Sequence, residues 1–419
     1  MFSLKRYWQK LSGKLWLRPT LSSAFAIFMA AFAYWFGQNF DSILDFNISE
    51  DTLLMLLGIF TSSMLSVATF TVSAIVTAAS SASNSTTPRA SQYVLNDGVA
   101  QFVLSTFIAA FIYSIVGIFS LKVLHYGSAG RFVLFLGLIF IVVLVLIALI
   151  NWIDHAIRLG RQSTIVNKLT EATVASIDPA VIGTFGAQRW QGDVPANSVA
   201  LYPQQFGYVT DLDMPRLQKQ AERTNTQLII NTRPGEIVEI TSPIAYITPA
   251  EHADENLEQA IQEAIATDTR RQPLRDIRHN LLNLTETADR ALSPGINDPG
   301  TAIHIMNIQM SLLIQWARVY YQQDCYEVHY DRLSLPTLSA ADLVSDCFNP
   351  IARDGAGIVE VGIRLQKVLQ ALTRLGSPEL TAAAKAMSST ALELAEHSLV
   401  AAEHRAKVAK IANEVAQAS

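Results

Sequence analysis

The sequence predicts an α-helical membrane protein: four transmembrane helices, followed by a cytosolic α+β region in which a small β domain precedes further helices. Three observations predict this fold class. Half of the 419 residues are hydrophobic, and the mean hydropathy of +0.26 is too high for an ordinary soluble protein. The apolar excess falls almost entirely before residue 154, in four runs without Asp, Glu, Lys or Arg. After residue 154, the composition is that of a soluble protein.

Each apolar run is long enough to cross a bilayer, because about 20 helical residues span the hydrocarbon core. The second run is the longest and is expected to tilt or protrude. The runs are Leu21 to Gly37, Leu53 to Ala79, Val99 to Leu121 and Phe132 to Ile153. The basic start of the chain and Ala31-Phe32-Ala33 also resemble a signal peptide, but the run continues through Phe36, so a retained helix is expected.

Basic residues near the ends of the spans predict the orientation of the chain. With the N-terminus inside, the outer loops carry only Lys122 and Arg131. The inner segments carry Lys5, Arg6, Lys10, Lys14, Arg18, Arg89, Arg158, Arg161 and Lys168. We therefore expect a multi-pass protein of the bacterial inner membrane with cytoplasmic N- and C-termini. The two cysteines, Cys325 and Cys347, would stay reduced in that compartment.

Composition divides the chain into five segments. These are a basic N-terminus (1–20), the transmembrane domain (21–153), a juxtamembrane helix and linker (154–197), a small β domain (198–250) and a helical cytosolic domain (251–419). A single basic helix from Trp152 to about Thr173 is expected to leave the membrane surface, and a linker from Asp178 to Pro195 follows. The β domain consists of short β-branched runs with one helix, Met214 to Thr224.

From Ala253 onward, the apolar periodicity predicts helices to the end of the chain. The expected helices are Asp254 to Ala266, Pro273 to Leu292, Pro299 to Tyr321, Leu338 to Cys347, Gly357 to Leu375 and Pro378 to about Ala416.

The sequence disfavours an enzyme and a nucleic-acid-binding protein. It contains no Walker loop, no G-x-G-x-x-G after a strand, no G-x-S-x-G, no H-E-x-x-H and no basic stripe with interleaved aromatics. The pairs Glu396-His397 and Glu403-His404 share a face of one predicted helix, but about 10 Å separates their imidazoles, too far for one metal ion. The segment TRPGEIVEITSPIAYI is similar to the turn-and-strand pattern of barrel-sandwich carrier domains, which predicts a hairpin, yet no lysine lies in it to accept lipoyl or biotin. We therefore expect no catalytic residue, no metal and no cofactor.

The second apolar run carries hydroxyl groups at steps of three and four residues, which places them on one helix face. This hydroxyl stripe consists of Ser62, Ser66, Thr69, Ser73, Thr77 and Ser80. It favours either close helix packing through small residues or a pore lining, with one helix from each subunit of a ring. Four spans do not readily enclose a water-filled path, so a pore requires a homo-oligomer. The inner loop from residue 80 to 98, with a lone Arg89, is then a cytoplasmic vestibule or a plain connector.

The segment RALSPGINDPGTA, residues 290–302, separates two predicted helices. Pro294 and Gly295 predict a type II turn with a positive φ at the glycine. Asn297 tolerates a left-handed conformation, Asp298 is the predicted N-cap, and Pro299 suits the first helical position. The alternative is an anionic ligand at this helix N-terminus, although Asp298 competes for the same N–H groups. The basic candidates for ligand contacts are Arg275, Arg278 and Arg290, together with Arg89 in the vestibule.

Three segments carry a resemblance to a known family: ALSPGINDPGTA, TTPRASQYVLNDGVAQFVLSTFIAAFIYS and FGYVTDLD…TRPGEIVEITSPIAYI. The chain resembles, to about residue 375, a bacterial family of predicted membrane proteins of unknown function whose hallmark is SPGINDP. The resemblance implies a multi-span inner-membrane protein with a cytosolic C-terminal domain, and it supplies no catalytic residues. This chain departs from the family's usual pattern at Gly300 and at Glu286 to Asp289.

The leading hypothesis is a homo-oligomeric inner-membrane channel or passive permeation protein with a cytosolic assembly or gating domain. The alternative is a membrane-anchored sensor or scaffold whose cytosolic domain binds an anionic ligand or a protein partner. The expected partners are the lipid bilayer, further copies of the chain, and small ions or an anionic ligand, but not nucleic acid.

Overall fold

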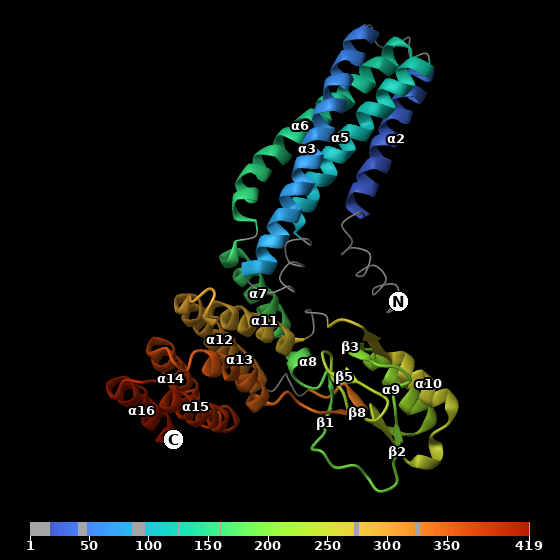
Figure 1. The fold of residues 1–419 in the computed structure, drawn as a ribbon. Helices are drawn as coiled ribbons and strands as arrows, with labels where there is room; N and C mark the ends of the chain where they lie inside the picture. Colours follow the sequence, from blue (N-terminus) through green and yellow to red (C-terminus); the bar gives the residue numbers. More distant parts are fainter. Residues whose placement is uncertain are drawn as a thin grey trace. The chain divides into compact units, whose positions relative to one another are not determined.

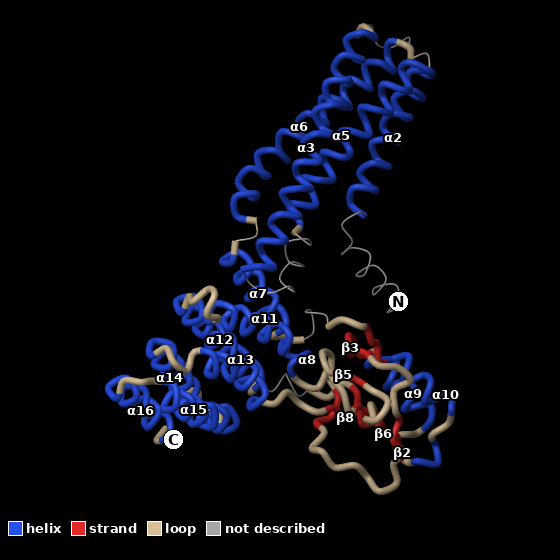
Figure 2. The backbone as a smooth tube through the Cα atoms, in the orientation of Figure 1, coloured by secondary structure: helices blue, strands red, loops and turns tan. Residues whose placement is uncertain are grey.

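The computed structural model describes residues 17–40, 48–85, 97–124, 126–159, 161–271, 276–322 and 327–418. The chain forms two compact units, here called the membrane unit (Met1–Ile165) and the C-terminal unit (Val166–Ser419). Figure 1 shows the order of the elements along the chain, and Figure 2 shows that strands occur only in the C-terminal unit among the described residues.

Among its described residues, the membrane unit contains four helices that are long and apolar enough to cross a bilayer. They are α2 (Leu17–Phe40), α3 (Glu50–Ser85), α5 (Gly98–Val123) and α6 (Ser128–Arg158). The four expected spans are therefore present, and each helix extends beyond its apolar run. The 36 residues of α3 have a length of about 54 Å, well above the roughly 30 Å of a hydrocarbon core.

Small residues set how closely the membrane helices pack. A Cβ atom on Gly37 of α2 would lie 2.8 Å from Cα of Gly130 on α6, so the two backbones touch at this crossing. Nearby, the Tyr126 hydroxyl donates a hydrogen bond to the Ala30 carbonyl across 3.0 Å. Toward the lower end of the bundle in Figure 1, α2 and α6 spread apart. The bundle is thus tight at the Gly37–Gly130 crossing and more open away from it.

The expected basic helix from Trp152 to Thr173 is wrong, because two helices occupy this range. Helix α6 ends at Arg158, Leu159 is extended, and α7 (Gln162–Ser176) begins after Arg161. Thr164 Oγ1 donates a hydrogen bond to the Arg158 carbonyl across 3.0 Å, which satisfies an acceptor at the break. The expected linker from Asp178 to Pro195 also contains the short helix α8 (Pro179–Ile182) and strand β1 (Ala187–Arg189).

Two sheets share the core of the strand-containing part. The larger has the order β1-β8-β4-β6-β2 and the smaller β5-β3-β7. Besides β1, the strands are β2 (Val199–Leu201), β3 (Gly207–Leu212), β4 (Gln227–Ile230), β5 (Ile237–Val238), β6 (Ala245–Thr248), β7 (Ile265–Asp268) and β8 (Tyr330–Leu335). Helices α9 (Met214–Thr224) and α10 (Glu255–Ala264) pack on the same core.

The sheets correct two expectations. First, the β domain is not confined to residues 198–250, since β1, β7 and β8 lie outside that range. Strand β8 runs parallel to both β1 and β4, so its pairing is set by distant residues and not by its neighbours in sequence. Second, TRPGEIVEITSPIAYI is not one hairpin, because β5 and β6 belong to different sheets.

The remaining helices form the second part of the C-terminal unit. The short 3-10 turn η2 (Ala250–His252) lies beside β6 and belongs to the strand-containing part. The α-helices of the second part are α11 (Ile277–Leu292), α12 (Pro299–Tyr320), α13 (Ala340–Asp354), α14 (Val359–Thr373), α15 (Pro378–Ser398) and α16 (Ala402–Ala416). Two of them depart from the expected bounds for identifiable reasons.

Helix α13 continues through Pro350 to Asp354, beyond the expected end at Cys347. A proline inside a helix leaves the carbonyl four residues earlier without its usual N–H donor. That carbonyl belongs to Asp346, and the Thr285 hydroxyl of α11 donates a hydrogen bond to it across 2.8 Å. A side chain from another helix therefore replaces the missing backbone donor.

The expected helix from Pro378 to Ala416 is two helices, with a break at Leu399 to Ala401. Arg405 Nη1 donates hydrogen bonds to the Leu399 and Val400 carbonyls, across 2.7 and 2.9 Å. These bonds satisfy acceptors that a continuous helix would pair internally. His397 and His404 consequently lie on different helices, and the expectation of a shared helix face is wrong.

Candidate functional site

The hydroxyl stripe forms a polar surface on one helix of the membrane unit. Its residues lie on α3, and all six are exposed in the isolated chain: Ser62, Ser66, Thr69, Ser73, Thr77 and Ser80. The buried residues of α3 include Met64, Ala68, Thr71 and Ile75. At about 100° per residue, these positions lie roughly opposite the stripe. The stripe therefore does not serve helix packing within one chain.

Most hydroxyl hydrogens of the stripe are used within α3 itself. Thr69 Oγ1 donates to the Leu65 carbonyl across 2.9 Å, Ser73 Oγ to the Thr69 carbonyl across 3.0 Å, and Thr77 Oγ1 to the Ser73 carbonyl across 2.9 Å. Ser62 and Ser66 bond to their own helix in the same way. Each oxygen keeps lone pairs that point outward, so this face offers acceptors to water or cations and is also tolerable against lipid.

Asp97 and His155 form a polar contact at one end of the bundle that the sequence alone did not indicate. Asp97 is 5% exposed and is the N-cap of α5: its Oδ1 accepts hydrogen bonds from Val99 N at 3.0 Å and Ala100 N at 2.9 Å. His155 Nε2, from the last turn of α6, lies 2.7 Å from the same oxygen but is not aligned as a hydrogen bond. The carboxylate thus fixes the start of α5 and ties it to α6.

The C-terminal unit contains a charged cleft of about 470 Å³, here called the TRPGE cleft. One wall is the turn between β4 and β5, with Arg233, Gly235 and Glu236. Gly235 has a φ of +96°, and a Cβ atom there would lie 2.2 Å from Oδ2 of Asp276. The backbone of this turn therefore packs directly against the carboxylate of Asp276, which is the N-cap of α11. Only glycine leaves room for this contact. Burial raises the pKa of Glu236, while Arg233 opposes the rise.

The three arginines of the TRPGE cleft already have partners. Arg233, which is 4% exposed, donates hydrogen bonds to the carbonyls of Gly183, Pro336 and Val181. Arg271 forms a two-pronged ion pair with Asp276, at 2.7 and 2.9 Å.

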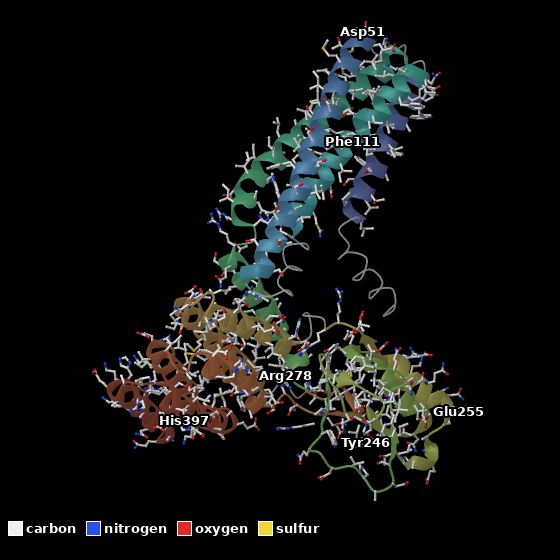
Figure 3. All side chains as sticks on the ribbon, viewed as in Figure 1. Asp51, Phe111, Tyr246, Glu255, Arg278 and His397 are labelled. Atoms are coloured by element: carbon white, nitrogen blue, oxygen red, sulfur yellow. The ribbon has the colours of Figure 1, made fainter. Side chains whose placement is uncertain are left out.

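Arg278 lies at the start of α11 (Figure 3) and binds Asp346 of α13 at 2.6 and 3.2 Å, with Asp342 at 3.2 Å. An anionic ligand at Arg271 or Arg278 would have to displace a carboxylate, so the geometry favours an internal ion network.

The corner at residues 293–298 is built differently from the expected type II turn. The Ser293 carbonyl accepts hydrogen bonds from Ile296 N at 3.0 Å and Asn297 N at 2.9 Å. The positive φ, +51°, is at Asn297, while Gly295 is not among the glycines with positive φ. The type II assignment is therefore wrong: asparagine supplies the left-handed residue, and the Pro294-Gly295 turn does not need one.

Asp298 is the N-cap of α12, with Pro299 in the first turn. Its Oδ1 accepts from Thr301 N across 3.0 Å, and Thr301 Oγ1 donates to Oδ2 across 2.6 Å. The carboxylate occupies the donors that an anion would need. Of the basic candidates, Arg89 and Arg275 lie outside the described residues, and Arg290 lies in the last turn of α11 with a buried Nε. Arg278 lines the TRPGE cleft, whereas Arg290 does not.

Residues 12–371 match the family described as "Predicted membrane protein (DUF2254)". The chain belongs to this family. It is a membrane protein with four apolar helices that would contact the lipid bilayer, and the family description names a location but no activity.

Similar proteins occur in mycobacteria. The chain is 23% identical over 310 residues to "Uncharacterized protein Rv1290c" of Mycobacterium tuberculosis (strain ATCC 25618 / H37Rv) and to "Uncharacterized protein Mb1321c" of Mycobacterium bovis, a match that covers 71% of this chain. It spans 59% of the length of these curated relatives. No solved structure matches the chain.

Proposed function

We propose that the protein is a homo-oligomeric channel or passive permeation protein of the bacterial inner membrane, in which α3 lines the path. The observation that carries the proposal is the position of the hydroxyl stripe, exposed and opposite the packed face of α3. In a ring of subunits, the stripes would meet at the axis, and their oxygens would replace part of the hydration shell of a permeating ion. The C-terminal unit would assemble or gate the ring.

The sequence supports the orientation in this proposal. Basic residues concentrate in the segments that would be cytoplasmic, and the first outer loop carries Asp41, Asp45, Glu50 and Asp51 instead. Both termini and the C-terminal unit would then be cytoplasmic. The proposal contains no catalytic step, in keeping with the absence of nucleotide-binding and nucleophile motifs from the sequence.

Cysteine scanning on α3 tests the pore directly. Ser73→Cys places a thiol on the stripe, and Val72→Cys places one at nearly the same depth but about 100° around the helix. In planar bilayers, we expect a water-soluble thiol reagent to reduce the conductance of Ser73→Cys severalfold and to leave Val72→Cys and the wild type unchanged. No conductance from purified wild-type protein, under varied voltage, tension and ions, would refute the channel.

Particle imaging tests the assembly independently. We expect a ring with countable symmetry and with α3 of each subunit at the axis. A monomer, or a ring with α3 at its periphery, would exclude the proposed path.

A membrane-anchored sensor or scaffold is the second candidate, and the TRPGE cleft is the observation that favours it. Its volume of about 470 Å³ is large enough for a small anionic ligand, which would have to displace Asp276 from Arg271, or Asp342 and Asp346 from Arg278. This candidate predicts that Ser66→Leu and Thr69→Leu leave activity intact, whereas charge reversal at Arg275 and Arg278 abolishes it. The channel predicts the opposite pattern for the α3 variants.

A further inference from the structure

A narrow apolar groove runs along the outside of the membrane unit, between α2, α5 and α6. Its volume is about 350 Å³. The floor is α5 from Phe102 to Tyr113, and the walls are α2 and α6. Phe25 on one wall is 56% exposed and Phe140 on the other is 54% exposed, so the groove opens toward the surface that lipid covers. The separation of α2 and α6 below their glycine crossing creates it (Figure 1).

The groove has the length of one membrane leaflet. It extends from Phe102 to Tyr113 on α5, from Leu21 to Met29 on α2 and from Gly137 to Leu144 on α6. At 1.5 Å per residue, these stretches are about 16, 12 and 10 Å long. One half of a hydrocarbon core is about 15 Å thick. The groove therefore occupies the half of the bundle nearer to Asp97.

The upper end of the groove is closed by a specific contact. The Tyr113 hydroxyl donates a hydrogen bond to the Leu134 carbonyl across 2.7 Å. A Cβ atom on Gly137 would lie 2.3 Å from the same hydroxyl oxygen, so the tyrosine fills the space that a side chain would take. The groove ends near the middle of the bilayer and is not a passage across it.

Size and polarity identify the occupant. One turn of an α-helix with its side chains fills roughly 400 Å³, so the groove cannot hold a helix of a second copy. Water is disfavoured, because the hydroxyls of Ser105 and Thr106 already donate to their own helix and a bound water needs two to four polar partners. An empty groove would cost the lining atoms their dispersion contacts. A flexible hydrocarbon chain meets all three constraints.

We propose that this groove binds one acyl chain of a phospholipid from the leaflet nearer to Asp97. The chain would contact protein on three sides, and it would therefore exchange more slowly than lipid at the open faces of the helices. This site is independent of the proposed channel, since it involves neither α3 nor the hydroxyl stripe.

Photolabelling tests the site in the full-length protein. The protein is reconstituted in vesicles of phosphatidylethanolamine and phosphatidylglycerol that contain a phospholipid with a diazirine in its acyl chain, then extracted, irradiated and mapped by peptide mass spectrometry. We expect label at residues 102–113 and 137–144 to exceed label at the exposed Ile150 of α6 by severalfold. Extraction before irradiation selects the slowly exchanging lipid.

Filling the groove provides the matched comparison. Ala109→Phe, on the groove floor, should lower the groove label severalfold, whereas Val76→Phe, which adds the same side chain on the exposed surface of α3, should not. If Ala109→Phe unfolds the protein, Ala109→Leu takes its place. Three results would each overturn the proposal. The first is equal labelling of the groove and Ile150 in the wild type. The others are groove labelling that persists in a folded variant with a filled groove, and cross-links between two copies through the groove.

Discussion

Asp289, in the last turns of α11, should make the stability of the C-terminal unit depend on pH near neutrality. Burial raises the pKa of this carboxyl from 3.8 to about 7, the charge of Asp354 adds to the rise, and Arg353 opposes it. The Oδ1 atom is buried and has no hydrogen-bond partner among the described residues. The perturbation is Asp289→Asn, which keeps the shape and removes the titration.

The sign follows from proton binding. Between pH 3.8 and about 7, the folded state holds a proton on Asp289 that the unfolded state has lost. Stability therefore falls as the pH rises through this window, and it is constant above it. The whole rise in pKa corresponds to about 4 kcal/mol. Because the carboxyl group is only part-buried, solvent screening reduces the effect between pH 5 and pH 8 to about 1–2 kcal/mol.

Thermal unfolding of the full-length protein in detergent measures this effect. Relative to the wild type, the free energy of unfolding of Asp289→Asn should be about 1–2 kcal/mol higher at pH 8 than at pH 5. This change corresponds to roughly 2–8 °C in the melting temperature of a unit of this size. If the gain in stability of the variant over the wild type is equal at both pH values, or larger at pH 5, the assignment of a raised pKa to Asp289 is refuted.

Three further substitutions test the local geometry by the same unfolding measurement. Asn297→Val should cost about 1–2 kcal/mol, because its φ is +51°, whereas Asn297→Gly should be tolerated; equal losses would contradict the left-handed assignment. Gly37→Ala should cost about 1–3 kcal/mol through its contact with Gly130, whereas Gly58→Ala meets nothing within 4 Å and should be neutral; the reverse order would exclude the crossing. Asp97→Ala should cost about 1–2 kcal/mol, and Asp97→Asn, which can still cap α5, should cost less; a neutral alanine variant would show that the cap is dispensable.

The sequence predicted those parts of the fold that local physics controls. The four spans follow from apolar runs longer than a bilayer core, and the α12 N-cap follows from the order Asp298-Pro299. The parts that were missed depend on distant partners. Strand β8 alternates buried Leu333 and Leu335 with more exposed residues, a period-two pattern that could have indicated it. Its parallel pairing with β1 and β4 could not have been found without the fold.

The same distinction separates the candidate sites. The hydroxyl stripe is a periodicity within one helix, so the sequence located it, but its exposure depends on which face of α3 packs. The TRPGE cleft joins a strand turn to the N-cap of α11, and Gly235 marks it only once Asp276 is known to lie against the turn. Arg278 was identified from a basic cluster. Its carboxylate partner Asp346 is 68 residues away in sequence, so its neutralisation could not be predicted.

The internal hydrogen bonds of the stripe separate its role in stability from its role in permeation. Thr69 Oγ1 donates to the Leu65 carbonyl, so its hydrogen is satisfied in lipid, and the residue is exposed. Thr69→Val keeps the shape and removes the oxygen, and it should change the stability of the folded chain by no more than about 0.5 kcal/mol. If the outward lone pairs serve a permeating ion, the same variant should lower the single-channel conductance severalfold while the melting temperature is unchanged. If the stripe instead packs subunits together through small residues, Thr69→Val should leave conductance intact and Thr69→Leu should dissociate the oligomer, because it adds bulk where backbones approach.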